Sequence, residues 1–354
     1  MKKILCISRR YAPSIGGMAT FATEVFSELK KSEDIETNLL VLGKNKWHFF
    51  WFYPYTLLYL LFFARKYDAI FVGDALMLFC GLVTKKVSPK TRRIVAVHGL
   101  DVTYSNRIYQ MIIRKYLNNS FDLFICNSQA TERLLIDRGN TKTAVITLGT
   151  NTSRFLGVPK NRDIWEKKYG IDNSKIILLT TGRLIKRKGV VWFLENVFPK
   201  LDNDYEYVIV GNGPEKNAIE KLIKKYGNDR VVLIDNASDS ELNEIYLNSD
   251  LFIMPNIRVE NDMEGFGLVA VEASLAGLVV IAADVDGIST AVVNEKNGYL
   301  VPTGDAGAFI GKIKELKGKD VSAKGEEFSN YTKANYNWKV VAENYKKSII
   351  RECE

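Results

Sequence analysis

Residues 264–272 read Glu-Gly-Phe-Gly-Leu-Val-Ala-Val-Glu, and this segment is the central motif of the chain. Small and apolar residues continue to Ala276, and Gly277 then provides a helix C-cap. Glu264 is therefore predicted at a loop–helix junction and Glu272 within the helix. The glycines beside Glu264 allow close approach of a ligand, and the free N–H groups at the helix start favour phosphate.

The carboxylate of Glu264 restricts what can bind there. Beside a phosphate-binding helix end, a carboxylate is unusual unless it accepts hydrogen bonds from a neutral ligand rich in hydroxyls, and a sugar meets that requirement. Two glutamates alone are more simply explained as solvated side chains, with the glycines forming a turn. The other residues of the chain decide between the two interpretations.

The composition is that of a globular chain long enough for two domains, with 354 residues, 47% hydrophobic and 25% charged. The net charge of +8 suits anionic small molecules or an anionic membrane surface. Nucleic acid is disfavoured because the basic residues are spread out. The four cysteines form no C-x-x-C pair and are expected to be free thiols in a reducing compartment, and no signal peptide is expected.

Short apolar runs alternate with helical stretches in both halves of the chain. The runs are Ile4–Ser8, Thr37–Leu42, Ala69–Gly73, Ile94–Val97, Leu123–Cys126 and Val145–Leu148, then Ile176–Thr180, Tyr207–Val210, Val231–Ile234, Leu251–Met254, Val279–Ala282 and Gly298–Val301. Continuous apolar strands separated by helices predict parallel sheets covered on both faces. We therefore expect two doubly wound α/β domains, with ligands bound beyond the carboxyl ends of the strands in the cleft between the domains.

Residues 47–64 are apolar and aromatic, and basic residues flank them. Their length permits a transmembrane helix, but Pro54 splits the run and strands continue on both sides. The part from Thr56 to Lys66 is expected to be a core helix. Trp47–Tyr55 suits a bilayer interface or a lipid-acceptor groove, and a core position is the alternative.

Further candidates for chemistry follow the predicted strands. Gly16-Gly17 precedes a helix and could place N–H groups at a diphosphate. Arg183 and Lys188 follow the first strand of the second half, where two cations can neutralise a phosphate pair. His98 follows another strand, and structural and catalytic roles for it both remain open.

Two further sets of charged residues have simpler interpretations. Lys186 and Arg187 are expected to be solvated. Asp284 and Asp286 are taken as loop acids and not as metal ligands.

The combination of Gly16-Gly17, His98, Arg183 with Lys188, the segment 264–272 and Trp338 resembles the retaining glycosyltransferases of family four, and the likeness covers nearly the whole chain. The resemblance implies the GT-B fold, two Rossmann-like domains facing across a cleft. Residues 1–158 would form the acceptor-binding domain and residues 159–335 the nucleotide-sugar-binding domain. The C-terminal helix, residues 336–354, would pack back on the first domain.

The resemblance also implies roles for individual residues. Glu264 would contact sugar hydroxyls, Glu272 the ribose, and Arg183 with Lys188 the diphosphate. The implied catalytic set is His98, Arg183, Lys188 and Glu264. The implied substrate-binding set is Gly16, Gly17, Arg183, Lys188, Glu264, Gly265, Phe266, Gly267, Leu268, Val269 and Glu272. No metal ion and no cofactor are expected.

The implied function is retaining transfer of a hexose or N-acetylhexosamine from a nucleotide-diphosphate sugar to a saccharide acceptor. A UDP-sugar is favoured and a GDP-sugar comes next. The acceptor is expected to be lipid-linked, in the synthesis of surface polysaccharide or lipopolysaccharide. The protein is expected in the cytoplasm, at the inner face of an anionic membrane, without a nucleic-acid partner.

The chain departs from the family pattern in three places. The segment Pro255–Asp262, before Glu264, is longer than usual. Residues 148–151 read Leu-Gly-Thr-Asn in place of Asn-Gly-Val-Asp, and residues 286–290 replace a segment like Gly-Gly-x-x-Glu. These departures leave the nucleotide base and the sugar open. The alternative functions are a nucleotide-sugar epimerase of the same fold and a non-catalytic sugar-nucleotide-binding scaffold.

Overall fold

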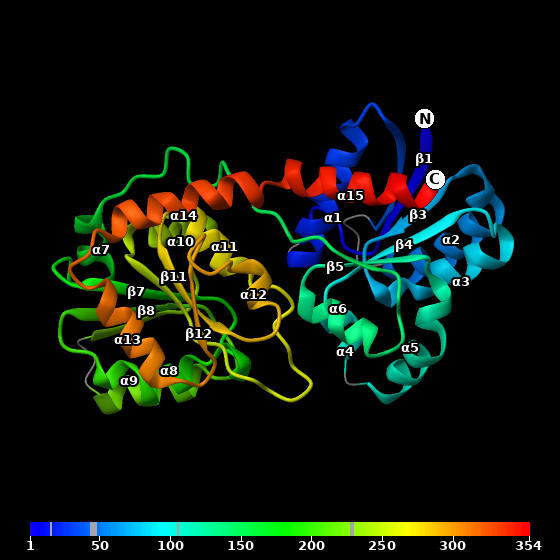
Figure 1. Ribbon diagram of the computed structural model, residues 1–354. Helices are drawn as coiled ribbons and strands as arrows, with labels where there is room; N and C mark the ends of the chain where they lie inside the picture. Colours follow the sequence, from blue (N-terminus) through cyan, green and yellow to red (C-terminus); the bar gives the residue numbers. More distant parts are fainter. Residues whose placement is uncertain (15, 43–47, 105, 227–229) are drawn as a thin grey trace. The chain divides into compact units, whose positions relative to one another are not determined.

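The computed structural model describes residues 1–354 except residues 15, 43–47, 105 and 227–229. The chain forms two compact units, Met1–Gly149 with Tyr336–Glu354, and Thr150–Asn335. Each unit contains one six-stranded parallel sheet with helices packed on it (Figure 1).

The sheet of the first unit has the order β2-β1-β3-β4-β5-β6. Its strands are β1 (Lys2–Ser8), β2 (Ile35–Val41), β3 (Ala69–Val72), β4 (Arg92–Val97), β5 (Leu123–Cys126) and β6 (Thr143–Val145). The central strands are apolar throughout because both faces are covered; β3, for example, is buried along its whole length. The strands lie at the predicted runs, although β6 ends at Val145 and not at Leu148.

Helices cover both faces of this sheet. They are α1 (Gly17–Lys31), α2 (His48–Phe63), α3 (Leu78–Val87), α4 (Leu100–Thr103), α5 (Arg107–Ser120), α6 (Gln129–Ile136) and α15 (Trp338–Cys353), with 3₁₀ turns η1 (Ala64–Lys66) and η2 (Ala75–Met77). On one face α1 packs against α15 (Figure 1), and the buried Tyr345 ring lies 5.4 Å from Phe21 and 5.5 Å from Phe71. On the other face α2, α3 and α5 share one hydrophobic core with the strands.

Helix α2 differs from the prediction in two respects. Pro54 lies inside the helix and does not split it, with its ring on the exposed side. The part from Thr56 to Lys66 is not a core helix, because only a narrow stripe that includes Thr56, Leu60 and Ala64 is buried while most of its apolar residues are exposed. Trp47, the first residue of the predicted aromatic segment, lies outside the described residues.

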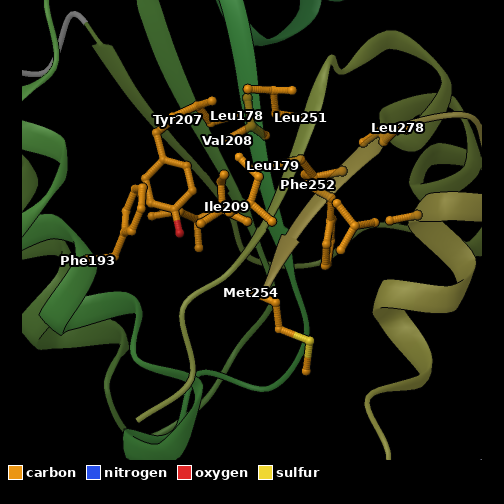
Figure 2. Packing of buried hydrophobic residues seen from close by; sticks show 14 of the residues in the cluster. Leu178, Leu179, Phe193, Tyr207, Val208, Ile209, Leu251, Phe252, Met254 and Leu278 are labelled. Carbon is orange, nitrogen blue, oxygen red and sulfur yellow. The ribbon is translucent and has the colours of Figure 1, made fainter. Parts of the chain in front are cut away.

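The sheet of the second unit has the order β12-β11-β10-β7-β8-β9. Its strands are β7 (Ile176–Thr181), β8 (Tyr205–Val210), β9 (Val231–Ile234), β10 (Leu251–Met254), β11 (Val279–Asp284) and β12 (Tyr299–Pro302). Side chains of β7, β8 and β10 form the middle of the core, and the rings of Phe193 and Tyr207 lie 5.0 Å apart on one face of the sheet (Figure 2).

The helices of this unit connect the parallel strands. They are α7 (Arg162–Tyr169), α8 (Val190–Asn196), α9 (Lys216–Tyr226), α10 (Asp239–Asn248), α11 (Leu268–Leu275), α12 (Ile288–Ala291), α13 (Ala306–Leu316) and α14 (Val321–Asn335), with 3₁₀ turns η3 (Lys186–Lys188) and η4 (Phe198–Lys200). Gly277 follows the last turn of α11 with φ 89°, as a helix-ending glycine does. Among the described residues, no helix combines the length and the apolar character needed to cross a bilayer.

Replacing Tyr345 tests whether α15 is an integral part of the first unit. We expect Tyr345→Ala to lower the free energy of unfolding by about 3–5 kcal/mol, because it leaves a cavity between α1, α15 and β3. Tyr345→Phe is the matched control, since the buried hydroxyl has no hydrogen-bond partner among the described residues, and we expect a change within about 1 kcal/mol. Urea denaturation measures both, and equal effects of the two variants would contradict this packing.

Candidate active site

The first loop of the second unit presents cations at the carboxyl end of β7. The strand ends at Thr181, and Gly182 follows with φ 130°, a conformation that glycine adopts without strain. A Cβ on Gly211 would lie 1.9 Å from the carbonyl oxygen of Gly182, so the next strand's loop supports this turn at very close range. The turn is therefore fixed, while the side chain of Arg183 is exposed to a ligand.

Lys188 and Glu264 form the central contact of the site. The Nζ of Lys188 lies 2.7 Å from a carboxylate oxygen of Glu264, and each side chain is 12% exposed. The same oxygen accepts a hydrogen bond from Asn256 at 3.2 Å and lies 3.5 Å from Nε of Arg187. This contact joins the loop after β7 to the segment after β10.

The charged partners decide the protonation state of Glu264. Burial alone would raise the pKa of this carboxyl, but the charges of Lys188 and Arg187 and the hydrogen bonds from Lys188 and Asn256 hold its pKa below the usual value. Glu264 is therefore an ionised hydrogen-bond acceptor at neutral pH. In this state it can accept hydrogen bonds from hydroxyl groups.

The prediction that Arg187 lies in solvent is wrong. Its side chain is 14% exposed, and its Nη1 lies 2.6 Å from a carboxylate oxygen of Asp262. Its carbonyl oxygen also accepts a hydrogen bond from the N–H of Ile257 at 3.0 Å. Arg187 thus connects the loop after β7 to the segment after β10. Lys186 beside it is exposed, in agreement with the prediction.

Asp286 and Gly287 brace the loop that carries Glu264. The carboxylate of Asp286 accepts a hydrogen bond from the N–H of Glu264 at 3.0 Å, and the N–H of Gly287 donates to the carbonyl of Glu264 at 2.9 Å. A Cβ on Gly287 would lie 2.2 Å from the carbonyl oxygen of Gly265. The interpretation of Asp286 as a plain loop acid therefore needs correction, because its carboxylate fixes the backbone of Glu264.

Helix α11 begins without a side-chain cap. Its N-cap is Gly267, with φ 98°, and its first turn contains no acidic residue. The N–H groups of Leu268 and Val269 at the helix start are thus suited to an anionic ligand. Phe266, 3% exposed, anchors the preceding turn in the protein. By contrast, α10 is capped by the side chain of Ser238.

Glu272 lies further along α11 and pairs with Arg154. The carboxylate is 2.5 Å from Nη1 of Arg154, and the guanidinium lies 5.5 Å from the ring centre of Phe155 and 5.6 Å from that of Tyr246. Burial raises the pKa of Glu272, and Arg154 acts against this rise. The pKa values of Glu264 and Glu272 therefore shift in opposite directions.

Gly16 and Gly17 stand at the start of α1 in the first unit. Gly16 is the N-cap, with φ 126°, and makes no side-chain cap. A Cβ on either glycine would meet no atom of the described residues within 4 Å. The start of α1 is therefore open to an anionic ligand.

His98 follows β4 in the first unit and lies in a hydrogen-bond network. Its Nε2 is 3.0 Å from the carbonyl oxygen of Gly73, and because a carbonyl can only accept, Nε2 carries the proton. The backbone N–H of His98 donates to the carboxylate of Asp101 at 2.9 Å, and the ring meets Phe21 edge-on at 4.8 Å. Burial raises the pKa of Asp101.

A buried ion pair adjoins this network. Nε of Arg9 lies 3.1 Å from the carboxylate of Asp74, with 10% and 1% of the two side chains exposed. Sequence reasoning did not select either residue. Arg9 comes directly after β1, and Asp74 comes two residues after the end of β3, so their position beyond neighbouring parallel strands was the signal that could have identified them.

The predicted residues thus fall into two groups. The second unit brings Lys188, Glu264 and the start of α11 together, with Arg183 on the same loop as Lys188 and Glu272 on the same helix. Gly16, Gly17 and His98 lie in the first unit. Three residues that the sequence analysis missed complete the second group: Arg154, Arg187 and Asn256.

Two family models match the chain. "Glycosyltransferase Family 4" matches residues 20–154, and "Glycosyl transferases group 1" matches residues 161–335. The chain belongs to the group 1 glycosyltransferases of family four. The protein is therefore a glycosyltransferase, and the family predicted from its motifs is confirmed.

Curated relatives and a solved structure agree with this assignment. The chain is 26% identical to the capsular polysaccharide biosynthesis glycosyltransferase CapM of Staphylococcus aureus, over 73% of this chain and 69% of CapM. It is 24% identical to the UDP-Gal:alpha-D-GlcNAc-diphosphoundecaprenol alpha-1,3-galactosyltransferase of Escherichia coli, over 72% of this chain and 68% of that enzyme.

The fold of this glycosyltransferase resembles that of Anabaena HepE, whose structure contains UDP and glucose. The TM-score is 0.75 at 17% identity, with 99% of this chain and 100% of the other covered. At this identity the likeness concerns the fold, and the predicted GT-B fold with two parallel sheets is confirmed.

Replacing Gly287 tests the brace under Glu264. Gly287→Ala places a Cβ against the Gly265 carbonyl, so we expect a loss of about 2–3 kcal/mol in the free energy of unfolding. Gly311 in α13 is the control, because a Cβ there meets no atom of the described residues within 4 Å. Gly311→Ala should be neutral or stabilise by up to about 1 kcal/mol through helix propensity. Urea unfolding compares them, and a neutral Gly287→Ala would show that the loop is not tightly braced.

Proposed function

We propose that this glycosyltransferase moves a hexose or N-acetylhexosamine from a nucleotide-diphosphate sugar to a lipid-linked saccharide acceptor, with retention of the anomeric configuration. The observation that carries the proposal is the largely buried pair of Lys188 and Glu264 beside the uncapped start of α11. This arrangement places a cation, free N–H groups and an ionised carboxylate together, which are the groups that a sugar diphosphate requires.

The diphosphate is assigned to Lys188, Arg183 and the start of α11. When the bond between the anomeric carbon and the phosphate oxygen breaks, negative charge develops on the departing nucleoside diphosphate. Two cations and the N–H groups of Leu268 and Val269, held in advance by the braced loops, would stabilise that charge. Together they would supply the positive charge that a divalent metal ion supplies in enzymes that bind the diphosphate through a metal.

The two glutamates are assigned to different hydroxyl groups. Glu264, ionised and next to the diphosphate position, would accept hydrogen bonds from the donor sugar. Glu272, further along α11, would accept them from the ribose. Gly265, Phe266 and Gly267 would contribute backbone contacts between these positions.

The first unit is assigned to the acceptor side. Gly16 and Gly17 open the start of α1, and His98 would lie near the reacting sugar. In a front-face reaction the acceptor oxygen bonds to the anomeric carbon on the side from which the phosphate leaves. The departing phosphate oxygen takes the acceptor's proton, so no carboxylate nucleophile is needed.

The donor and acceptor classes are inferred from the relatives. The Escherichia coli enzyme is named for UDP-galactose and for an acceptor on diphosphoundecaprenol, and CapM is named for capsular polysaccharide biosynthesis. A UDP-sugar is therefore favoured over a GDP-sugar, and surface polysaccharide or lipopolysaccharide synthesis is the favoured setting. A lipid-linked acceptor is anchored in a membrane, so the enzyme would act at the membrane surface. The net charge of +8 suits the anionic inner face on the cytoplasmic side.

Exchanging Lys188 tests the diphosphate assignment. We expect Lys188→Ala to lower kcat/KM by about 10²–10³-fold, because the variant loses charge stabilisation in the transition state. Lys186→Ala, in the same 3₁₀ turn but exposed, is the control and should stay within about 3-fold of wild type. Initial rates with a UDP-sugar and a lipid-linked saccharide measure both. Similar losses in the two variants would place the diphosphate elsewhere.

The pH dependence of nucleotide binding tests the role of Glu272. Burial raises the pKa of Glu272, and only the ionised carboxylate accepts hydrogen bonds fully, so affinity should fall as the pH falls through that pKa. Arg154→Ala removes the charge that opposes the rise, so the loss should begin at a higher pH than in wild type. Calorimetric titration with UDP at a series of pH values measures the affinity. Lys168→Ala, which disrupts an ion pair with Glu241, is the control variant. Identical pH profiles for wild type and Arg154→Ala would exclude Glu272 from the site.

The products of one incubation separate the possible activities. A labelled UDP-sugar with acceptor should give a glycoside whose anomeric configuration, determined by NMR, matches that of the donor. An inverted linkage would exclude the retaining mechanism. An epimerised nucleotide sugar without acceptor would instead identify an epimerase. Full function in cells of the Lys188→Ala and Glu264→Ala variants would indicate a binding scaffold.

A further inference from the structure

Three neighbouring helices of the first unit contain no acidic residue. Helices α2, α3 and α5 pack side by side on one face of the sheet and share its core. Their sequences contain neither aspartate nor glutamate, although the chain has 41 such residues among 354. The helices on the opposite face, α1 and α15, do contain acids, such as Glu24 and Glu343. The two faces of the unit therefore differ in charge.

Basic residues accompany the acid-free face. Arg65 and Lys66 lie in the turn η1 after α2, and Lys85 and Lys86 lie in the last turn of α3. Helix α5 contributes the exposed residues Arg107, Arg114 and Lys115. The ammonium of Lys66 lies 4.6 Å from the ring centre of Phe63, so this charge lies beside an aromatic side chain of α2. In these three helices and in the 3₁₀ turn after α2, every residue with a formal charge is therefore basic.

The exposed part of α2 is apolar and aromatic. The helix contains no charged residue, and only a narrow stripe is buried. Trp51 and Phe62 are each 74% exposed, and Tyr55 and Leu58 between them are 55% and 54% exposed. A helix that is apolar on all sides is normally covered completely, so this side of α2 requires an apolar partner.

A second apolar surface and a hollow extend this face. On α5, Ile108 and Met111 are 67% and 63% exposed. A hollow of about 410 Å³ lies between α2 and the edge strand β2, and its walls are apolar. They consist of Leu40, Val41, Leu42, Trp51, Phe52, Pro54, Tyr55 and Leu58. The exposed apolar surface of the unit is therefore not confined to α2.

We propose that the outer face of α2, α3 and α5 docks on an anionic lipid bilayer, with α2 lying in the membrane interface. Apolar and aromatic side chains of α2 and α5 enter the hydrocarbon boundary, and the surrounding Lys and Arg residues bind lipid phosphates. With 16 residues, α2 is about 24 Å long, shorter than the hydrocarbon core of about 30 Å, so it lies along the surface.

Charge complementarity decides between a bilayer and a second copy of the chain. Two copies joined through this face would bring cations against cations without any acid from these helices, which is unfavourable. An anionic bilayer supplies both the apolar phase and the negative charge. The proposal deepens the membrane placement that belongs to the proposed function, but binding to vesicles requires no turnover.

Vesicle sedimentation of the full chain tests the proposal. We expect binding to vesicles of phosphatidylcholine with phosphatidylglycerol, and at least 10-fold weaker binding to phosphatidylcholine alone. The double variant Trp51→Ser/Phe62→Ser should weaken binding to the anionic vesicles at least 10-fold. The control Leu156→Ser/Ile164→Ser removes side chains of the second unit that are 77% and 54% exposed, and it should bind as wild type does.

A second pair of variants tests the charge. Arg114→Glu/Lys115→Glu on α5 should also weaken binding at least 10-fold, whereas Lys221→Glu/Lys224→Glu on α9, equal in charge change, should have less than a 3-fold effect. Equal thermal midpoints for all variants would show that they fold.

Three outcomes overturn the proposal. They are no vesicle binding by the wild type, equal losses in variants and controls, and a dimer in gel filtration that Trp51→Ser/Phe62→Ser dissociates. UDP binding by the same variants reports on the proposed function separately. It should be unchanged, so that failure of membrane docking and failure of the donor site are distinguishable.

Discussion

The contact between Lys188 and Glu264 is the interaction on which the donor site depends. An ion pair with only 12% of each side chain exposed is costly unless each charge is fully compensated. Arg187 and Asn256 provide that compensation on one side, and Asp286 holds the backbone of Glu264 on the other. The result is an ionised carboxylate in a fixed position, next to a helix start that is not occupied by a capping side chain.

Glycines make this arrangement possible by letting the loops approach one another. A Cβ on Gly189 would lie 1.9 Å from the carbonyl oxygen of Pro255, and one on Gly287 would lie 2.2 Å from that of Gly265. The loops after β7, β10 and β11 therefore contact one another through their backbones. Their side chains are then free to face a ligand, and the positions of these side chains are set before a ligand arrives, which is the condition for electrostatic stabilisation of a transition state.

The sequence predicted much of the fold, because continuous apolar strands and the helices between them leave few alternatives to parallel sheets. It also indicated Lys188, Glu264 and the start of α11, since each stands beside glycines at a strand or helix end. Arg154 could not be found, because its pairing with Glu272 is a tertiary contact without a local pattern. The exposure of α2 was not predicted for a related reason. An apolar sequence predicts burial, and only the structure shows which of its side chains are packed in the core.

The most direct test of the central claim is a crystal structure of the protein with a bound UDP-sugar. The account predicts phosphate oxygens within about 3 Å of Nζ of Lys188 and of the N–H groups of Leu268 and Val269, with sugar hydroxyls on Glu264 and the ribose on Glu272. A nucleotide bound away from α11, with the Lys188–Glu264 contact unchanged and untouched by the ligand, would contradict it.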